Sequence, residues 1–340
     1  MGGRALKGEN TITRRYEREE FDAISIELMD TLKPDFKRVA IPLFYKNKPS
    51  FGDADILLSM EDFKGNMREY ITNKFNPNEI FHNGNCWSFD YKDLQVDLIT
   101  VSAEDFDTNE MYFSYNDLGN YIGKIAHGFG LKYGQNGLTY DHYFKGMNIG
   151  RVIISKDYRK IFEFLGLDYN RYLIGFDELE DIFKYISESK YFNWEYLQLE
   201  NNNKVNRDRD KKRKSYMLFL EYIDKNVKDD SHKFQYEKDK TIYIDKINDF
   251  FPEANLELEI RKAEYEYCKS LYIKTKFNGG DVMRKYGLEG KELGDAMNGF
   301  KVFIDNVIGS DTYEDYIINS SIESIYEDFE SYKIIIKHIK

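Results

Sequence analysis

The sequence predicts an α+β fold, in which an antiparallel or mixed sheet with helices comes first and a mainly α-helical body follows. Four of the five prolines lie before residue 80, and proline interrupts helices. Segments with strand character are concentrated before residue 150, whereas apolar residues take helical spacing after it. An early helix followed by antiparallel strands, without β-α-β alternation, is typical of the α+β class.

The first hundred residues contain one helix and several short strands. Phe21, Ile24, Leu28 and Leu32 recur at helical spacing and predict a helix over 18–32, which Lys33-Pro34 ends. Runs rich in strand-forming residues predict strands at 38–44, 54–59, 86–91 and 94–101. The last two runs are separated only by Lys92-Asp93, so we expect them to form a hairpin.

The next segment combines a short helix with a second hairpin. We expect a helix over 116–129 and strands at 131–133 and 138–140, joined by a turn at Asn136-Gly137. Beyond residue 150 the apolar spacing predicts helices at 157–165, 176–189, 214–225 and 256–272.

Length and composition indicate a folded, multidomain protein. The chain has 340 residues, 41% of them hydrophobic, and a formal net charge of −11. This length exceeds what one core usually serves, so we expect two or three domains. No run approaches a membrane span and the N-terminus lacks a signal peptide, so we expect a cytoplasmic protein without a membrane partner. Net acidity disfavours general binding of polyanions but leaves room for a local basic channel.

Three carboxylates form the strongest candidate site. Asp53 and Asp55 follow Gly52 at the start of an apolar strand, and alternation places both on one face. Asp97 lies inside a second apolar strand, where a lone charge is costly to bury. If the strands are neighbours, the three carboxylates converge in the arrangement that two hard cations require. The structural alternative is a strand-entry turn capped by Asp53 and Asp55, with Asp97 facing water at a sheet edge.

These motifs and their order resemble the DNA polymerase β superfamily of nucleotidyltransferases, and family X DNA polymerases in particular. The resemblance covers about residues 12–145 and is carried by 14–21, 44–48, 52–55, 96–98 and 112–120. It implies a catalytic palm over 1–150. The helical spacing beyond residue 150 predicts a helical domain over 151–250 and a C-terminal helical domain over 251–340. The resemblance also implies magnesium, or manganese, as the cofactor.

The resemblance assigns roles to individual residues. Asp53 and Asp55 would ligate both metal ions, and Asp97 would ligate one and help activate a 3′-hydroxyl. The nucleotide-binding set that it implies is Arg15, Lys46, Lys48, Gly52, Tyr112, Phe113, Asp117 and Asn120. Of these, Arg15 and Lys46 would hold the triphosphate, Tyr112 and Phe113 the sugar, and Asp117 and Asn120 the base. Lys124 stands where the family carries a residue that reaches the templating strand.

Two departures from the superfamily pattern bear on nucleotide binding. Pro42-Leu43 stands where a Gly-Ser pair usually cradles the triphosphate, and proline lacks an N–H. Either Arg and Lys side chains replace that cradle, or triphosphate affinity is low. Tyr115 replaces a glycine of the nucleotide pocket. The alternative for Arg15, Lys46 and Lys48 is a solvated surface.

Residues 277–294 resemble a motif in the helical bodies of tRNA CCA-adding enzymes and bacterial poly(A) polymerases. They predict a helix that ends at Gly287 in a left-handed cap, a tight turn, and a second helix whose first amides, around Gly290, could receive a phosphate. The alternative is a purely structural helix-turn-helix. The whole chain also resembles phage-encoded proteins described as nucleotidyltransferases, which would place it in the host cytoplasm.

A basic run is the best candidate for nucleic-acid contact outside the palm. Its cations are Arg207, Arg209, Lys211, Lys212, Arg213 and Lys214. Tyr216 follows as a candidate stacking residue. The alternative for the run is a solvated loop and helix start.

The expected function is therefore metal-dependent transfer of a nucleotide from a nucleoside triphosphate to the 3′-hydroxyl of a nucleic acid, with an RNA or tRNA end favoured. A family X-like DNA polymerase is the first alternative. Nucleotide transfer to a protein or small molecule, and a degenerate nucleic-acid-binding module, are the others.

Overall fold

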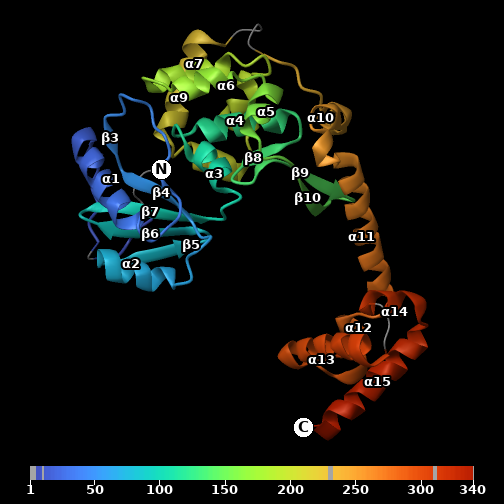
Figure 1. The fold of residues 1–340 in the computed structure, drawn as a ribbon. Coiled ribbons are helices and arrows are strands. Elements are labelled where there is room, and N and C mark those ends of the chain that lie inside the picture. Colours follow the sequence, from blue (N-terminus) through green and yellow to red (C-terminus); the bar gives the residue numbers. More distant parts are fainter. Residues whose placement is uncertain (1–4, 10, 229–232, 309–311, 340) are drawn as a thin grey trace. The chain divides into compact units, whose positions relative to one another are not determined.

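The computed structural model describes residues 5–9, 11–228, 233–308 and 312–339. The chain divides into two compact units (Figure 1). The first comprises Met1–His142 and Arg151–Glu257, and the second Tyr143–Gly150 and Leu258–Lys340. Among the described residues, no helix combines the length and apolar character needed to cross a membrane.

The first unit begins with a mixed sheet, and its described part has the strand order β2-β4-β7-β6-β5. These strands are β2 (Val39–Ala40), β4 (Asp53–Ser59), β5 (Ile80–Asn83), β6 (Cys86–Tyr91) and β7 (Leu94–Val101). β4 and β7 pair in parallel, whereas the other neighbours pair antiparallel. The parallel pair therefore lies inside the sheet, with a strand on either side.

Helices α1 (Arg18–Leu32) and α2 (Met67–Phe75) pack on the same core as the sheet. Every second residue of β4 and β7, including Ala54, Ile56 and Val96, belongs to that core. The residues between them, among them Leu57 and Ile99, pack on the opposite face with Phe106. A short pairing of β1 (Tyr16–Glu17) with β3 (Ser50–Phe51) precedes β4.

The remainder of the first unit is mostly helical around a second sheet with strand order β10-β9-β8. Its elements are α3 (Phe106–Phe113), α4 (Leu118–Gly128), β8 (Lys132–Gly134), β9 (Gly137–Phe144), β10 (Met147–Ser155), α5 (Tyr158–Phe164), α6 (Tyr169–Ile174), α7 (Leu179–Ser187), η1 (Trp194–Leu197), η2 (Leu199–Asn201), α8 (Lys204–Asp210), α9 (Lys214–Asn226), η4 (Lys240–Tyr243), α10 (Ile244–Phe250) and η5 (Pro252–Ala254). The tip of the β9–β10 hairpin belongs to the second unit.

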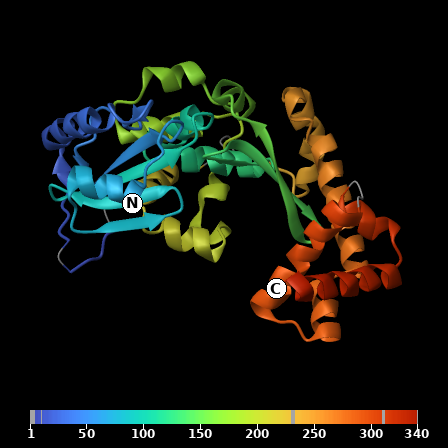
Figure 2. The same ribbon diagram turned by 60° about the horizontal axis from the view of Figure 1, so that its bottom comes forward.

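The second unit is helical apart from that tip. It contains α11 (Leu256–Lys276), α12 (Gly279–Tyr286), α13 (Gly290–Phe303), the π-helical turn η6 (Ile304–Ile308), α14 (Tyr313–Asn319) and α15 (Ile322–Ile339). The helices of this unit are coloured orange to red in Figure 2. The core that they share includes Phe277, Phe300 and Phe329.

The fold class agrees with the sequence prediction, and so do most elements. The helix at 18–32, the hairpin at 86–101 and the left-handed cap at Gly287, with a φ of 69°, are confirmed. The predicted strand at 38–44 is wrong beyond Ala40, because buried Pro42 offers no N–H and Leu43 bonds instead to Ser114 and Tyr115. The predicted second hairpin is formed by β8 and β9, but a further strand, β10, follows it and continues to Ser155, past the point at which we expected only helices.

Candidate metal centre

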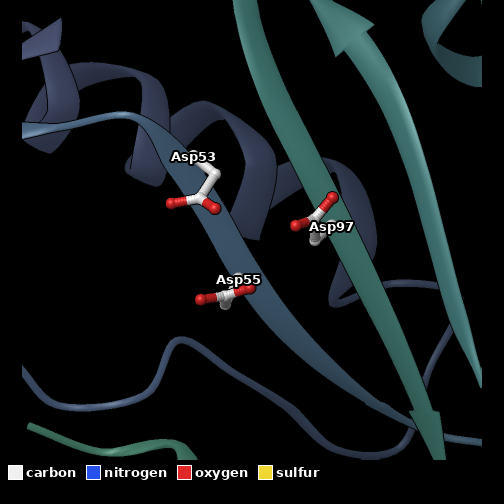
Figure 3. A group of neighbouring side chains, drawn as sticks. All are labelled: Asp53, Asp55 and Asp97. Atoms are coloured by element: carbon white, nitrogen blue, oxygen red, sulfur yellow. The ribbon is translucent and has the colours of Figure 1, made fainter. Parts of the chain in front are cut away.

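Three carboxylates meet on the face of the sheet opposite α1 and α2. Asp53 and Asp55 lie on β4, and Asp97 lies on β7 (Figure 3). One oxygen of each carboxylate lies within 4.8 Å of the others, a grouping that can hold a metal ion. The expected convergence of these side chains is confirmed.

Strand alternation and parallel register together create this cluster. In β4, Ala54 and Ile56 enter the core below the sheet, so Asp53 and Asp55 point away from it. The register places Asp55 directly opposite Asp97, and Asp53 opposite Gln95. Neighbouring β6 contributes Ser88, which pairs with Asp97 from the other side. A shift of either strand by one residue would turn the carboxylates of that strand toward the apolar core on the opposite face.

The cluster is electrostatically costly without a cation. Burial, together with the charges of Asp53 and Asp97, raises the pKa of Asp55 well above its usual value. Burial and the charge of Asp53 raise the pKa of Asp97 to about 6, although hydrogen bonds from Ser88 and Gln95 oppose this change. Divalent cations held by hard oxygen ligands would relieve this repulsion. The donor set therefore fits one or more Mg²⁺ or Mn²⁺ ions.

Gln95 is a site residue that sequence reasoning missed. Its side chain is only 2% exposed, and its Nε2 lies 2.9 and 3.0 Å from the two carboxylate oxygens of Asp97. Its position two residues before Asp97, on the same strand face, was the available signal. Gly52, which is buried between β3 and β4, places Asp53 at the first position of its strand.

Lys48 is a predicted phosphate ligand whose charge interacts with the carboxylates of β4. Burial lowers the pKa of Lys48, while the negative charges of Asp53 and Asp55 raise it. Its Nζ lies 3.3 Å from Asn116 Oδ1 and 4.4 Å from the centre of the Phe51 ring. The ammonium group of Lys48 therefore interacts electrostatically with the two carboxylates of β4, Asp53 and Asp55.

Arg15 and Lys46 have other partners in the structure. The guanidinium of Arg15 donates to Ser50, with Nη2 2.8 Å from the main-chain oxygen. Nζ of Lys46 lies 2.6 Å from Asp177 Oδ1, and both side chains are exposed. Either side chain would have to leave these partners to hold a triphosphate, so their roles stay predictions.

The segment from Tyr112 to Asn120 joins α3 to α4 through two left-handed residues. Tyr115 and Asn116 have φ values of 59° and 61°, a region that favours glycine. The Tyr115 ring is buried against Tyr172 and Phe176, which offsets this backbone cost. Tyr112 and Phe113 are half-buried, with ring centres 5.3 Å apart. A Cβ on Gly119 would lie 2.4 Å from the main-chain oxygen of Tyr112, so only glycine fits there.

Three predicted ligands on α4 are tied to the predicted basic run. Asp117 accepts from Arg213 Nη1 at 2.6 Å and from the Ser215 hydroxyl. Asn120 Oδ1 accepts from Arg209 Nη2 at 3.2 Å. Lys124 lies 3.5 Å from Asp210, which is fully buried and also pairs with Arg209.

The basic run therefore has an inner and an outer set of cations. The inner pair, Arg209 and Arg213, contacts α4. The outer set comprises Arg207, which is half-buried, and the exposed Lys211, Lys212 and Lys214. None of these four cations forms an ion pair within the described residues. The suggestion that Tyr216 stacks on a base is wrong, because this ring is fully buried and its hydroxyl donates to Leu197 O at 2.6 Å.

Comparisons with known proteins do not identify a family for this chain. No family model matches the sequence, and no curated protein matches it. Among solved structures, polymerase β of Leishmania infantum, crystallised as a ternary gap complex, is similar with a TM-score of 0.35 and 14% identity. The similarity covers 46% of this chain and 69% of that chain. The functional assignment therefore depends on the side chains of the site.

Proposed function

We propose that the chain is a divalent-metal-dependent nucleotidyltransferase, which transfers a nucleotide from a nucleoside triphosphate to the 3′-hydroxyl of a nucleic acid. The observation that carries this proposal is the cluster of Asp53, Asp55 and Asp97 on two adjacent strands, with Lys48 beside it. Such a cluster suits displacement at phosphorus, where negative charge must be neutralised around the transferring group.

The residues of the site would have different roles in the proposed reaction. Asp53 and Asp55 would hold the metal ions, and Asp97 would complete their ligands. When bound, these ions would neutralise the phosphates and lower the pKa of the attacking hydroxyl. Lys48, whose charge interacts with those of Asp53 and Asp55, would neutralise further phosphate charge. The hydroxyl oxygen bonds to the α-phosphorus, pyrophosphate leaves, and the hydroxyl proton passes to solvent.

Two features support a polynucleotide acceptor. The outer cations of the basic run, Arg207, Lys211, Lys212 and Lys214, offer charge for phosphate contacts. The helix-turn-helix around Gly287, which resembles a motif of tRNA CCA-adding enzymes and bacterial poly(A) polymerases, favours an RNA or tRNA end. A family X-like DNA polymerase is the alternative, favoured by the order of the motifs from Arg14 to Asn120.

An acceptor panel tests the proposal. Gapped DNA, single-stranded RNA, trimmed tRNA and protein are each incubated with labelled ribo- and deoxynucleoside triphosphates and Mg²⁺ or Mn²⁺. We expect extension of an RNA end, which Asp55→Asn abolishes and Asp90→Asn, a change at a buried aspartate of β6, preserves. Deoxynucleotide incorporation on gapped DNA alone would favour the alternative. Labelled protein would indicate a different acceptor class, and no transfer with any acceptor would contradict the proposal.

A further inference from the structure

A chain of hydrogen bonds connects the N-terminal segment to the metal site through Gln95. The main-chain N–H of Ala5 donates to Gln95 Oε1 at 2.9 Å. The other end of the same amide, Nε2, lies 2.9 and 3.0 Å from the two carboxylate oxygens of Asp97. An amide has one acceptor end and one donor end, so the Ala5 bond directs the donor end toward Asp97.

The N-terminal segment is held in place at further points. The N–H groups of Lys7 and Gly8 donate to the Glu79 carboxylate at 2.7–3.1 Å. The N–H of Arg14 donates to Asp93 O at 2.8 Å, at the turn between β6 and β7. Ala5 is thus followed closely by a stretch of chain that is anchored at Lys7, Gly8 and Arg14.

We propose that Gln95 is a positioning residue for metal binding: held by Ala5, it orients the Asp97 carboxylate toward Asp53 and Asp55. The inference rests on the proposed function, because it takes the three carboxylates to be metal ligands. Partners that donate to a ligating carboxylate fix its orientation, and losing them typically weakens metal affinity about 10–100-fold. A neutral amide does this without placing a positive charge beside the cation.

The direct test measures Mn²⁺ affinity of the full chain, by electron paramagnetic resonance of the free ion. Gln95→Met keeps the length of the side chain but removes both of its hydrogen bonds. We expect the dissociation constant for Mn²⁺ to rise about 10–100-fold. The matched control is Gln198→Met, a glutamine between η1 and η2, which should leave the constant unchanged. Circular dichroism verifies that each protein is folded.

A second pair of variants tests the link to Ala5 without altering the core. Ala5→Pro removes the N–H that donates to Gln95 and leaves the Gln95 side chain in place. We expect the dissociation constant for Mn²⁺ to rise about 2–10-fold, less than for Gln95→Met. Leu6→Pro is the control, since the Leu6 N–H makes no hydrogen bond within the described residues.

A double variant separates positioning from a general effect on the fold. In an Asp97→Asn background, the additional Gln95→Met change should alter Mn²⁺ affinity less than about twofold, because the group that Gln95 orients has lost its charge. If Gln95→Met lowers Mn²⁺ affinity as much in the Asp97→Asn background as in the wild type, the inference is overturned. It is also overturned if Gln95→Met alone binds Mn²⁺ with wild-type affinity.

Tighter Mn²⁺ binding by Gln95→Met would also overturn the inference, because the amide would then occupy the place of the metal. If the wild type binds Mn²⁺ but transfers no nucleotide, the proposed function fails and the affinities still decide the role of Gln95; a wild type that binds no Mn²⁺ refutes both.

Discussion

Replacing Asp97 with asparagine should stabilise the metal-free protein while removing most of its response to metal. Asp97 is 9% exposed, and burial with the nearby charge of Asp53 raises its pKa from 3.8 to about 6. A difference of one pKa unit corresponds to about 1.4 kcal/mol, so ionised Asp97 costs the folded chain up to about 3 kcal/mol. The carbonyl oxygen of the substituted asparagine can still accept from Gln95. At pH 7.5 in EDTA we therefore expect the free energy of unfolding of Asp97→Asn to be about 1–3 kcal/mol higher than that of the wild type.

The pH dependence follows from the direction of the pKa change. Because the folded chain binds the Asp97 proton more tightly than the unfolded chain, the stability of the metal-free wild type falls as pH rises from about 4 to about 6. The difference in the free energy of unfolding between Asp97→Asn and the wild type should therefore decrease below pH 6 and vanish near pH 4. With metal at about 100 times its dissociation constant, the wild type gains about 2.7 kcal/mol and the variant much less.

Urea unfolding followed by tryptophan fluorescence measures these differences. Both tryptophans, Trp87 and Trp194, lie in the first unit, so the signal reports the unit that contains the site. Asp90→Asn is the control, because the Asp90 carboxylate accepts from Asn78 and from the Glu79 N–H at 2.7 and 2.8 Å. It should lose about 1–2 kcal/mol with or without metal. If Asp97→Asn is no more stable than the wild type in EDTA and metal stabilises both equally, the reasoning is refuted.

Three further predictions concern the cations of the site and its surroundings. Lys48→Met should raise the nucleotide KM or lower kcat by about 10–100-fold. Lys46→Met should have a smaller effect, because Lys46 pairs with exposed Asp177. Equal effects of the two variants in steady-state assays would contradict this ranking. A second variant replaces the four outer cations with glutamine: Arg207, Lys211, Lys212 and Lys214. The log–log slope of polynucleotide affinity against salt concentration should become shallower by about three to four units, while nucleotide affinity stays unchanged. An unaltered slope would place the nucleic acid elsewhere. Arg213→Gln should instead destabilise the first unit by about 1–3 kcal/mol, because Asp117 loses its ionic partner, and adding Asp117→Asn should recover most of this loss in urea unfolding.

Several features of the site could be predicted from the sequence because they depend on local geometry. Alternation along a strand placed Asp53 and Asp55 on one face, and the cost of a lone buried charge required partners for Asp97. The parallel pairing of β4 with β7 then brought the three together, as expected. The cap at Gly287 was similarly predictable, since a left-handed residue that ends a helix is usually glycine.

Other features depend on contacts between distant segments, which leave no periodic signal. The pairing of Asp117 with Arg213 joins the start of α4 to the start of α9, and Arg209 bonds to Asn120 on α4. The sequence pattern of a basic run did not predict these contacts. Tyr216 illustrates the same limit, because an aromatic residue after a basic run resembles a stacking platform until the core that buries it is known.

By itself, the sequence determined the α+β class, the two apolar strands with their carboxylates and the charged segment that runs from α8 into the start of α9. These depend on residue periodicity and on the energetic cost of burying charge. The tertiary structure alone decided which cation lies beside the carboxylates, which cations of the basic run face solvent, and that Ala5 and Gln95 reach Asp97. The physical reason is that a side chain's partners are set by the packing of whole elements, whereas its face on a helix or strand is set by its immediate neighbours in the chain.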